Sequence, residues 1–548
     1  MRLHHACSLL LVASACTTGA EYTRVVPASE AAPDAGPVAA APVDAGPPAP
    51  KIDVDALRAE AKSLLQKQAE LSWKSWTAGE PLDLASTYAG HDALFSADSV
   101  AAVQAKAQAE SDPAAKRALG NLELYLTSEH LAKETAALDD QLAALEGSAT
   151  VTVDGVELPY RNVESMLANE PDHAKRLALQ NATSPVVKRL AAVLEKRDAR
   201  LDELIQALGY PSYAALSARL RDCDLDALAK QADAVLTQTD APYKKAMADA
   251  VHKELVLPLT DMHRADVPRF FHSSAVQSAF PGPQMVTRFN AFLAGMGVDL
   301  VALKLTVDSR DMPRKNPRAL CIPVSVPGDV RLSFKPKGGV DDYAQLYHEG
   351  GHAVQFAATT TPVWEFQQLG DSAVAQAFAF LFEDRLEDPR YLAELGMTGE
   401  LLHGWVRSAA VKKLYLLRRA AAKVLVAQAR HGAQPLAGAA LVAKDRELMG
   451  RAEGFALTDA DAERDLVEPD DFFAAADELR AWILAAQLDA ALSKKFGESW
   501  WRSPQAGQML RGLWAHGSEL TAEQMAQAVG AKDLDAAPLL NRLQRALQ

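Results

Sequence analysis

The chain has 548 residues, of which 49% are hydrophobic and 23% are charged. This composition is close to the average of globular proteins, so it excludes a wholly disordered chain and a fibrous repeat. The formal net charge is −14, from 71 acidic and 57 basic residues. Proteins that bind nucleic acids need a basic surface for phosphate contacts, so the acidic balance argues against a nucleic-acid partner.

The first 16 residues have the pattern of an export signal. Arg2 supplies a positive charge, and the apolar stretch at residues 6–15 is too short to span a bilayer. The stretch ends in Ala-Ser-Ala-Cys at residues 13–16, which resembles a bacterial lipobox with Cys16 as the lipidated residue, although Ala13 stands where Leu is usual. The alternative is an ordinary signal peptide cleaved near the same place. We expect an exported protein of the bacterial cell envelope, in contact with a membrane only through its lipid anchor.

Residues 17–50 have the composition of a linker. Seven prolines lie between Pro27 and Pro50, and the tetrapeptide DAGP occurs twice. Such a segment cannot bury a core and prefers extended conformations, so we expect a tether. Beyond the signal, Cys223 and Cys321 are the two cysteines left, and they could form one disulfide or none.

Residues 51–548 are predicted to form a mostly α-helical body. One segment shows the pattern: Ser184 is a candidate N-cap, Pro185 suits the first helical position, and Gly209 suits the position after the last turn. Between them, apolar residues recur at the spacing of one helix face. Similar patterns predict helices over 54–73, 113–146, 225–255, 406–430 and 479–496.

A short β-hairpin is predicted immediately before the most informative motif of the chain. Residues 321–326 are apolar and β-branched, and Pro327-Gly328-Asp329 is a turn tripeptide. Apolar and polar residues then alternate over 330–334, which is the period of a half-buried strand.

The motif that carries chemistry is HEGGH at residues 348–352. His348 and His352 are four residues apart, so on a helix that begins at Asp341 or Asp342 they project from one face and can share a metal ion. Glu349 can reach water at such a metal without being a ligand, which is the position of a general base. Gly350 and Gly351 are unfavourable inside a helix, and close backbone packing would explain them.

The alternative is an exposed helix with two unrelated histidines. Apolar residues flank the motif on both sides, with Leu346 before it and Ala353, Val354 and Phe356 after it. We therefore expect the helix to be buried and the histidines to bind a metal, with zinc the default. A catalytic zinc site needs a third protein ligand. Asp371 is a candidate N-cap of a second helix, and Gln376 and Glu383 share one face of that helix. The downstream candidates for the third ligand are Glu365, Asp371, Gln376, Glu383 and Asp384.

The sequences LYHEGGHAVQF and LGDSAVAQAFAFLFEDRLEDP resemble the zinc oligopeptidases of the thimet oligopeptidase and oligoendopeptidase group, and more distantly angiotensin-converting enzyme. The resemblance covers most of residues 160–500. It implies a largely α-helical, two-lobed metallopeptidase fold with a deep channel, in which one Zn²⁺ is held by His348 and His352 and Glu349 is the base. The hairpin would then offer an edge strand to an extended peptide.

Two departures from this family pattern bear on activity. The family's third ligand is a glutamate that falls on Gln376, 28 residues after His348, so zinc binding should be weak. Asp371 could substitute, although a helix cap is its simpler role, and Glu383 would need a shifted helix. The Tyr and His side chains that the family uses to stabilise the oxyanion have no counterpart here: Ala474, Glu478 and Ala481 stand where tyrosines are expected. Arg480 could replace these donors or form an ion pair.

The sequence therefore predicts a zinc-dependent peptidase that cuts short peptides. The alternatives are a catalytically degenerate member that binds peptides or acts as a scaffold, and a helical envelope protein in which HEGGH is incidental. Two other features have simpler interpretations. The acidic run from Asp459 to Asp465 is predicted to be a solvated loop, and Trp500, Trp501 and Trp514 are predicted to pack in the core.

Overall fold

The computed structural model describes residues 52–272, 276–468 and 470–548. It is mostly α-helical, as predicted, with two small sheets. The α-helices are α1 (Val54–Ala78), α2 (Ala97–Ala109), α3 (Pro113–Ser148), α4 (Val163–Asn169), α5 (His173–Asn181), α6 (Ser184–Ala207), α7 (Tyr213–Arg221), α8 (Leu225–Leu255), α9 (Val267–Phe270), α10 (Met285–Gly295), α11 (Val340–Ala358), α12 (Trp364–Gln368), α13 (Ser372–Glu383), α14 (Pro389–Glu394), α15 (Gly399–His431), α16 (Gly438–Glu453), α17 (Asp459–Leu466), α18 (Ala474–Phe496), α19 (Pro504–Trp514), α20 (Ala522–Ala528) and α21 (Ala537–Leu547). The strands are β1 (Thr150–Val153), β2 (Val156–Pro159), β3 (Thr306–Asp308), β4 (Leu320–Ser325) and β5 (Asp329–Ser333).

The helices predicted from periodicity all form, and aspartate side chains cap the N-termini of α1, α3 and α8. The helix predicted over 225–255 matches α8 to the residue, and the Asp224 carboxylate accepts hydrogen bonds from the amides that open it. Helix α18 ends at Gly497, whose φ of +90° costs any other residue more than it costs glycine.

Two local predictions are wrong. Ser184 is the first residue of α6 rather than its N-cap, because Thr183 already has helical φ and ψ and no side chain caps the helix. The acidic run is not a solvated loop but helix α17, whose N-terminus is closed by a capping box between Thr458 and Asp461. Asp461 is buried and accepts a hydrogen bond from Gln180, and Asp465 pairs with Arg264. Hydrogen-bond donors and cations from other helices thus pair with acidic residues that the sequence pattern suggested were exposed to solvent.

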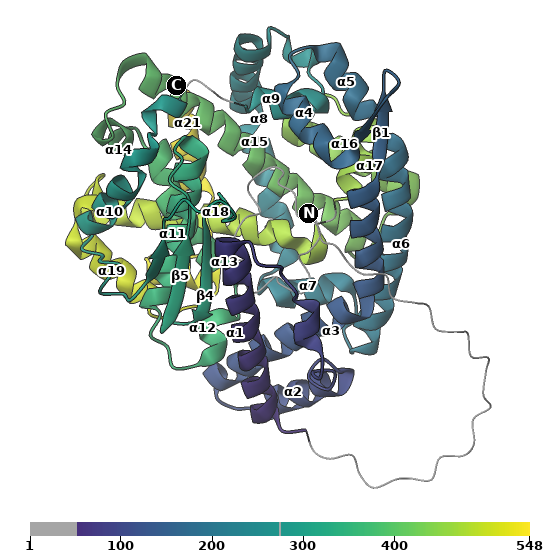
Figure 1. Cartoon of the computed structure of the whole chain (residues 1–548), viewed down its shortest axis with the longest axis vertical. Helices are drawn as coiled ribbons and strands as arrows, with labels where there is room; N and C mark the ends of the chain where they lie inside the picture. Colours follow the sequence, from purple (N-terminus) through teal and green to yellow (C-terminus); the bar gives the residue numbers. More distant parts are fainter. Residues whose placement is uncertain (1–51, 273–275, 469) are drawn as a thin grey trace, which may run out of the picture.

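The predicted hairpin is confirmed as β4 and β5, which pair antiparallel with Cys321 opposite Leu332. A third strand, β3, joins β5 in parallel, which gives the strand order β3-β5-β4. A separate two-stranded hairpin, β1-β2, follows α3. The three-stranded sheet packs beside α1 and α11, so it supports the HEGGH helix from one side (Figure 1).

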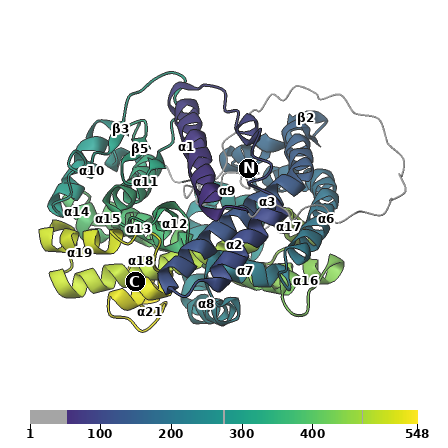
Figure 2. The ribbon, with the colours of Figure 1, turned by 90° about the horizontal axis from the view of Figure 1, so that it is seen from below.

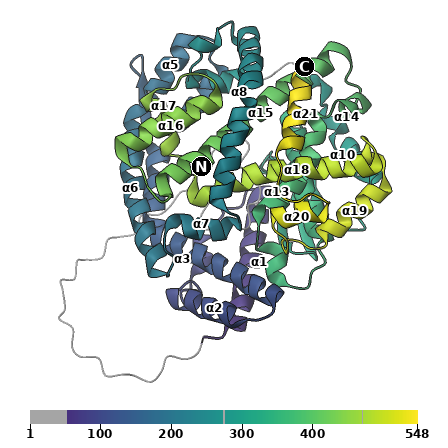
Figure 3. The ribbon, with the colours of Figure 1, turned by 180° about the vertical axis from the view of Figure 1, so that it is seen from behind.

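The long helices connect two groups of elements. Figures 1 and 3 show α10, α11, α14 and α19 at one end of the molecule and α4, α5, α6, α16 and α17 at the other. Helix α15 packs against α8, α16 and α18, and α18 also packs along α13, so these helices link the groups. Figure 2 shows α1, α2 and α3 close to one another when the molecule is seen from below. Most apolar side chains form one large core, and a smaller core lies between the end of α3, the β1-β2 hairpin, α4, α5 and α6.

The predicted signal, Cys16 and nearly all of the linker lie outside the described residues. Cys223 and Cys321 are both free thiols, so they do not form a disulfide. None of the helices in the described part of the chain is both long and apolar enough to cross a bilayer. The three tryptophans predicted to pack in the core are fully buried.

Candidate metal and proton-transfer site

The HEGGH motif lies in the second half of α11, where every residue from Leu346 to Ala358 is buried. The helix begins after Gly339, and Asp341 and Asp342 stand in its first turn, where negative charge suits the helix dipole. The predicted burial of the motif is therefore confirmed. Buried histidines and a buried carboxylate are costly unless they have polar partners, so their partners identify their roles.

The two glycines of the motif allow neighbouring elements to approach closely. A Cβ atom on Gly351 would lie 2.7 Å from the Cα atom of Ala379 and 2.8 Å from the carbonyl oxygen of Phe378, both on α13. A Cβ atom on Gly350 would overlap the ring of Phe289 on α10. Close backbone packing, as predicted, explains why glycine occupies these two helical positions.

Two contacts fix how α11 and α13 align. Gly351 meets Ala379, and His348, one turn earlier, is hydrogen bonded to Glu383, one turn later on α13. The two helices therefore run antiparallel. Gln376, one turn before Ala379, must then lie at the level of His352 and the residues that follow it on α11.

His348 is oriented by Glu383. Its Nδ1 atom lies 2.9 Å from Glu383 Oε2, which leaves Nε2 as the nitrogen that can face a metal ion. Burial acts to lower the pKa of His348, but the hydrogen bond and charge of Glu383 outweigh burial and raise that pKa. The His348 and His352 rings lie 4.9 Å apart between centroids and are inclined by 80°. The two imidazoles thus gather on one face, as the motif predicted.

Glu349 is 3% exposed, and its Oε2 atom accepts a hydrogen bond of 2.8 Å from the backbone amide of Cys321 in β4. Burial raises the pKa of Glu349 to about 7, although the charge of His348 and this hydrogen bond act in the opposite direction. A carboxyl group with a pKa near 7 can both accept and return a proton at neutral pH. The β-hairpin therefore positions the predicted base.

Two glutamines complete the polar groups on this face. Gln376 of α13 is half-buried. Gln355 follows His348 by seven residues and His352 by three, so the three side chains share one face of α11. Gln355 is fully buried, and neither atom of its amide has a hydrogen-bond partner among the described residues. A buried amide without partners is costly, and an ion or an ordered water is the usual explanation. Sequence reasoning missed Gln355, although its spacing was visible.

The other candidates for the third ligand have other partners. Both oxygens of Asp371 accept hydrogen bonds from the guanidinium of Arg480, at 3.1 and 2.6 Å, and Asp371 also caps α13 through the amide of Ala373. Arg480 is fully buried and also binds Glu523, so it cannot serve as an oxyanion donor without leaving this pair. Glu365 pairs with Arg58, and Asp384 pairs with Lys413 and Arg542.

A second missed residue is Lys413 of α15. Its ammonium group pairs with Asp384 at 3.1 Å and lies 5.5 Å from the centroid of the Phe380 ring, which is next to the His348 ring. Burial raises the pKa of Glu383, but the hydrogen bond to His348 and the charge of Lys413 outweigh burial and lower that pKa. Lys413 therefore helps to keep Glu383 ionised. Its sequence context, two adjacent lysines in a helix, gave no indication of this role.

The prediction that an extended peptide could add to the edge of β4 does not fit the structure. The Cys321 amide on this edge is bonded to Glu349, and the carbonyl oxygen of Pro323 accepts a hydrogen bond of 2.7 Å from Gln368. Pro323 has no amide hydrogen to offer. Two side chains of α11 and α12 thus occupy the groups that a peptide would need.

Within residues 52–272, 276–468 and 470–548, no group of three or more His, Cys, Asp or Glu side chains is arranged to hold a metal ion. Besides the two imidazoles, this face carries the amides of Gln355 and Gln376. No family model matches the chain, and no curated protein matches it. The resemblance to zinc oligopeptidases thus stays a prediction from the motifs.

Proposed function

We propose that the chain is a zinc-dependent peptidase that hydrolyses short peptides, with His348, His352 and Gln376 as metal ligands and Glu349 as general base. The observation that carries this proposal is the buried pair of imidazoles, one of which is oriented by a carboxylate. Histidines that ligate metals commonly donate their second ring nitrogen to a carboxylate. The second imidazole, His352, lies on the same face of α11, so the two rings together offer a metal ion two nitrogen ligands.

The residues present fit a zinc ion with neutral protein donors. His348 presents Nε2, His352 lies on the same face, and the amide oxygen of Gln376 or Gln355 would be the third donor. Zinc, when bound, supplies Lewis acidity that makes water a better nucleophile at neutral pH. Because no carboxylate joins this donor set, we expect weak binding, as the sequence predicted from Gln376.

The chain's own residues then have separate roles. Glu349 takes a proton from the attacking water and returns it to the leaving amine, and its pKa of about 7 suits both steps. Glu383 holds the Nδ1 proton of His348 and so fixes the orientation of the ring. Following the motif resemblance, the substrate would lie in a channel between two lobes.

A second candidate function is peptide binding without turnover. One observation favours it: Arg480 is fully engaged in a buried ion pair, so it does not supply an oxyanion donor. An enzyme that lacks oxyanion donors loses roughly 10²–10³ in rate for each donor. The fold and the metal site would then serve recognition rather than hydrolysis.

Zinc titration combined with a peptidase assay tests the proposal. Wild type should bind one zinc ion, and His348→Ala should abolish binding. Gln376→Glu should raise affinity at least tenfold, about 1.4 kcal/mol, because a carboxylate adds an opposite charge next to the metal. Glu394→Gln is the matched control, since Glu394 on α14 pairs with Arg502, and it should not change the zinc affinity.

Turnover of a quenched peptide library separates the two candidate functions. Hydrolysis that requires zinc and is lost in Glu349→Gln supports the peptidase. Peptide binding without hydrolysis, in wild type and in Gln376→Glu, supports the binding function. If neither wild type nor Gln376→Glu binds zinc, both the metal site and the peptidase proposal fail.

We further propose that the protein is exported and anchored through a lipid on Cys16, with residues 17–50 as its tether. The supporting observation is the lipobox-like sequence at residues 13–16. Wild type should partition into detergent, whereas Cys16→Ser should be released or keep its signal. Wild type that is fully soluble after export, with an unmodified N-terminus, would exclude the anchor.

A further inference from the structure

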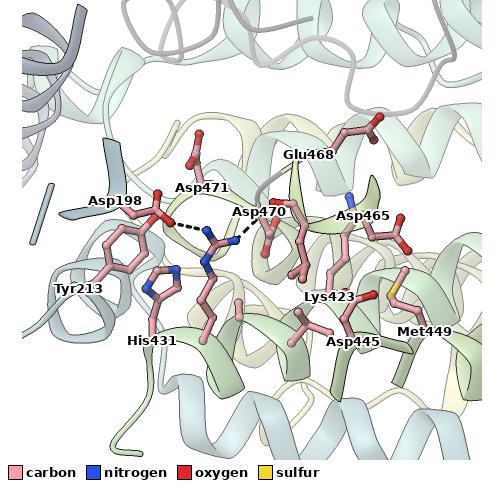
Figure 4. Close-up of a pocket in the computed structure, with 14 residues that line it drawn as sticks. Asp198, Tyr213, Lys423, His431, Asp445, Met449, Asp465, Glu468, Asp470 and Asp471 are labelled. Carbon is pink, nitrogen blue, oxygen red and sulfur yellow. Dashed lines mark hydrogen bonds and ion pairs between the residues drawn. The ribbon is translucent and has the colours of Figure 1, made fainter. Parts of the chain in front are cut away.

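A second polar recess lies around the C-terminal half of α15, and none of its lining residues belongs to the candidate metal site. Residues of α6, α7, α15, α16 and α17, together with the turn that follows α17, line it (Figure 4). Its cavity has a volume of about 40 Å³. This volume exceeds the ~10–15 Å³ that one water requires, but it is far too small for a whole peptide.

Negative charge dominates the lining of the recess. The basic side chains of the lining are Lys423 and Arg430. Arg430 pairs with Asp198, and the charge of Lys423 acts to lower the pKa of Asp465 and of Asp470. Arginines from outside the lining neutralise Asp471 and Asp465. The carboxylates of the lining are Asp198, Asp445, Asp465, Glu468, Asp470 and Asp471.

Asp445 is the unusual member of this set. It is 2% exposed, and its Oδ1 atom has no hydrogen-bond partner among the described residues. Oδ2 of Asp470, on another side of the recess, also lacks a partner in the described part of the chain. Figure 4 shows both carboxylates beside the same cavity. Asp470 is half-buried, and its other oxygen accepts a hydrogen bond of 2.7 Å from the amide of Ala475. Buried carboxylate oxygens without partners are costly, so Asp445 Oδ1 and Asp470 Oδ2 leave room for a cation that can donate hydrogen bonds.

We propose that this recess binds a primary ammonium group, with Asp445 as its main acceptor and Asp470 as the second. An ammonium group has the size of a water molecule and carries three N–H donors with a full positive charge. It donates hydrogen bonds of about 2.7–3.2 Å, so it can bridge carboxylates that lie too far apart to bind one metal ion. This agrees with the absence, among the described residues, of three acidic, His or Cys side chains arranged for a metal.

The charges around Asp445 predict how the binding depends on pH. Burial and the neighbouring Asp465 of α17 raise the pKa of Asp445 to about 8; Glu453 of α16 acts in the same direction, while Arg264 and Arg419 oppose it. His431 stays neutral because burial lowers its pKa to about 3. The cation must therefore displace a proton from Asp445 at pH 7. Affinity should rise between pH 6.5 and pH 9, where an alkylammonium ion is still charged.

Calorimetric titration of the full chain with n-butylammonium tests the proposal. At pH 9 the ion should bind at one site, whereas 1-butanol, which lacks charge, and tetramethylammonium, which lacks N–H donors, should not bind. Asp445→Asn should weaken binding at least tenfold. The matched control is Asp459→Asn on α17, an exposed residue outside the recess, and it should bind as wild type does. The proposal does not depend on the peptidase activity, so either can fail alone.

A second measurement does not require a variant. Titrations near pH 7.5 in two buffers of different ionisation enthalpy should show close to one proton released for each ion bound. Three results would each overturn the proposal: equal affinities of wild type and Asp445→Asn, binding without proton release, and the absence of saturable binding. The last of these would mean that the recess holds water only. Nα-acetyl-lysine amide and alanine amide then distinguish a lysine side chain from a chain terminus as the natural source.

Discussion

The two ends of α13 each carry a carboxylate with a basic partner, buried at Asp371 and half-buried at Glu383, yet the partners differ. At the N-terminus, Asp371 accepts two hydrogen bonds from the Arg480 guanidinium and one from each of the amides of Ala373 and Ala522. At the C-terminus, Glu383 receives one hydrogen bond from the imidazole of His348. Arginine is permanently charged and has N–H donors but no acceptor or metal-ligating atom, so the Asp371–Arg480 pair offers no ligand. Imidazole has a second nitrogen, so the second pair leaves a ligand available.

The pair at the N-terminus of α13 therefore stabilises the helix, whereas the pair at its C-terminus orients a candidate metal ligand. Arg480 ties α18 to α13, and Ser372, the first residue of α13, donates a hydrogen bond to Asp477 of α18. The helix that carries Gln376 and Glu383 is therefore fixed at its N-terminus. A rigid α13 can then hold Glu383 where it orients His348, which is what a preorganised metal site needs.

The largest effect should come from removing the Asp371–Arg480 pair. Asp371→Ala leaves Arg480 buried with less compensation, so the free energy of unfolding should fall by about 3–5 kcal/mol. Asp459→Ala breaks an exposed pair with Arg446 and should cost less than about 1 kcal/mol. Urea unfolding of the three proteins measures both changes. If Asp371→Ala is as stable as wild type, Asp371 does not anchor α13.

The next largest effect should come from separating α11 and α13. A methyl group on Gly351 meets the backbone of α13, which cannot rotate away, so Gly351→Ala should destabilise the protein by about 3 kcal/mol and weaken zinc binding. Gly404→Ala is the matched control, because nothing lies near its added Cβ in helix α15. That variant should be stabilised by up to about 1 kcal/mol. The opposite order of stability would contradict the packing.

How much the sequence could predict depends on the distance between interacting residues along the chain. Helices such as α8, the β4-β5 hairpin and the close packing at Gly350 follow from local patterns, because caps, turns and periodicity act over a few residues. The partners of Asp371 and Asp465 could not be inferred, because Arg480 and Arg264 reach them from elements distant in sequence. Helix α17 is a different case, because the capping box between Thr458 and Asp461 that opens it is local and its spacing is visible in the sequence.

At the site itself, the spacing of four residues predicts that His348 and His352 share one helix face, and the structure brings the two rings together there. Glu349, the next residue after His348, is instead held by the Cys321 amide of β4. The position of Glu383 against His348 depends on the register of two antiparallel helices, which the spacing within either helix does not determine. Gln355 could have been found from its spacing. Its lack of partners is a property of the packed structure alone.

The third prediction tests the Glu383–His348 pair. Glu383→Gln keeps the shape of the side chain but removes the charge that orients and supports His348, so zinc affinity should fall by about 10- to 100-fold. Stability without zinc should change little compared with Asp371→Ala. Glu394→Gln, on the neighbouring α14, controls for the loss of an acidic charge. If zinc affinity is unchanged in Glu383→Gln, then Glu383 does not position the ligand.

The smallest expected effect concerns a carboxyl group that lacks a cationic partner. Glu129 of α3 is buried and accepts a hydrogen bond of 2.9 Å from the Tyr88 hydroxyl. Burial raises its pKa from the usual 4.5 to about 8, and the hydrogen bond only partly opposes this. Between these values the folded protein holds a proton that the unfolded chain has lost. The stabilising contribution is therefore complete below pH 4.5 and is lost as the pH rises through 8.

One such proton corresponds to about 1.4 kcal/mol for each pH unit. Between pH 6 and pH 7, wild type should therefore lose about 1 kcal/mol of stability relative to Glu129→Gln, whose amide does not titrate. Glu134→Gln, an exposed position on the same helix, should follow wild type. Urea unfolding at several pH values measures the three slopes. Parallel curves for wild type and Glu129→Gln would mean that Glu129 is ionised in the folded protein. Glu129 would then have the same charge state as Asp371 and Glu383, although no cation pairs with it among the described residues.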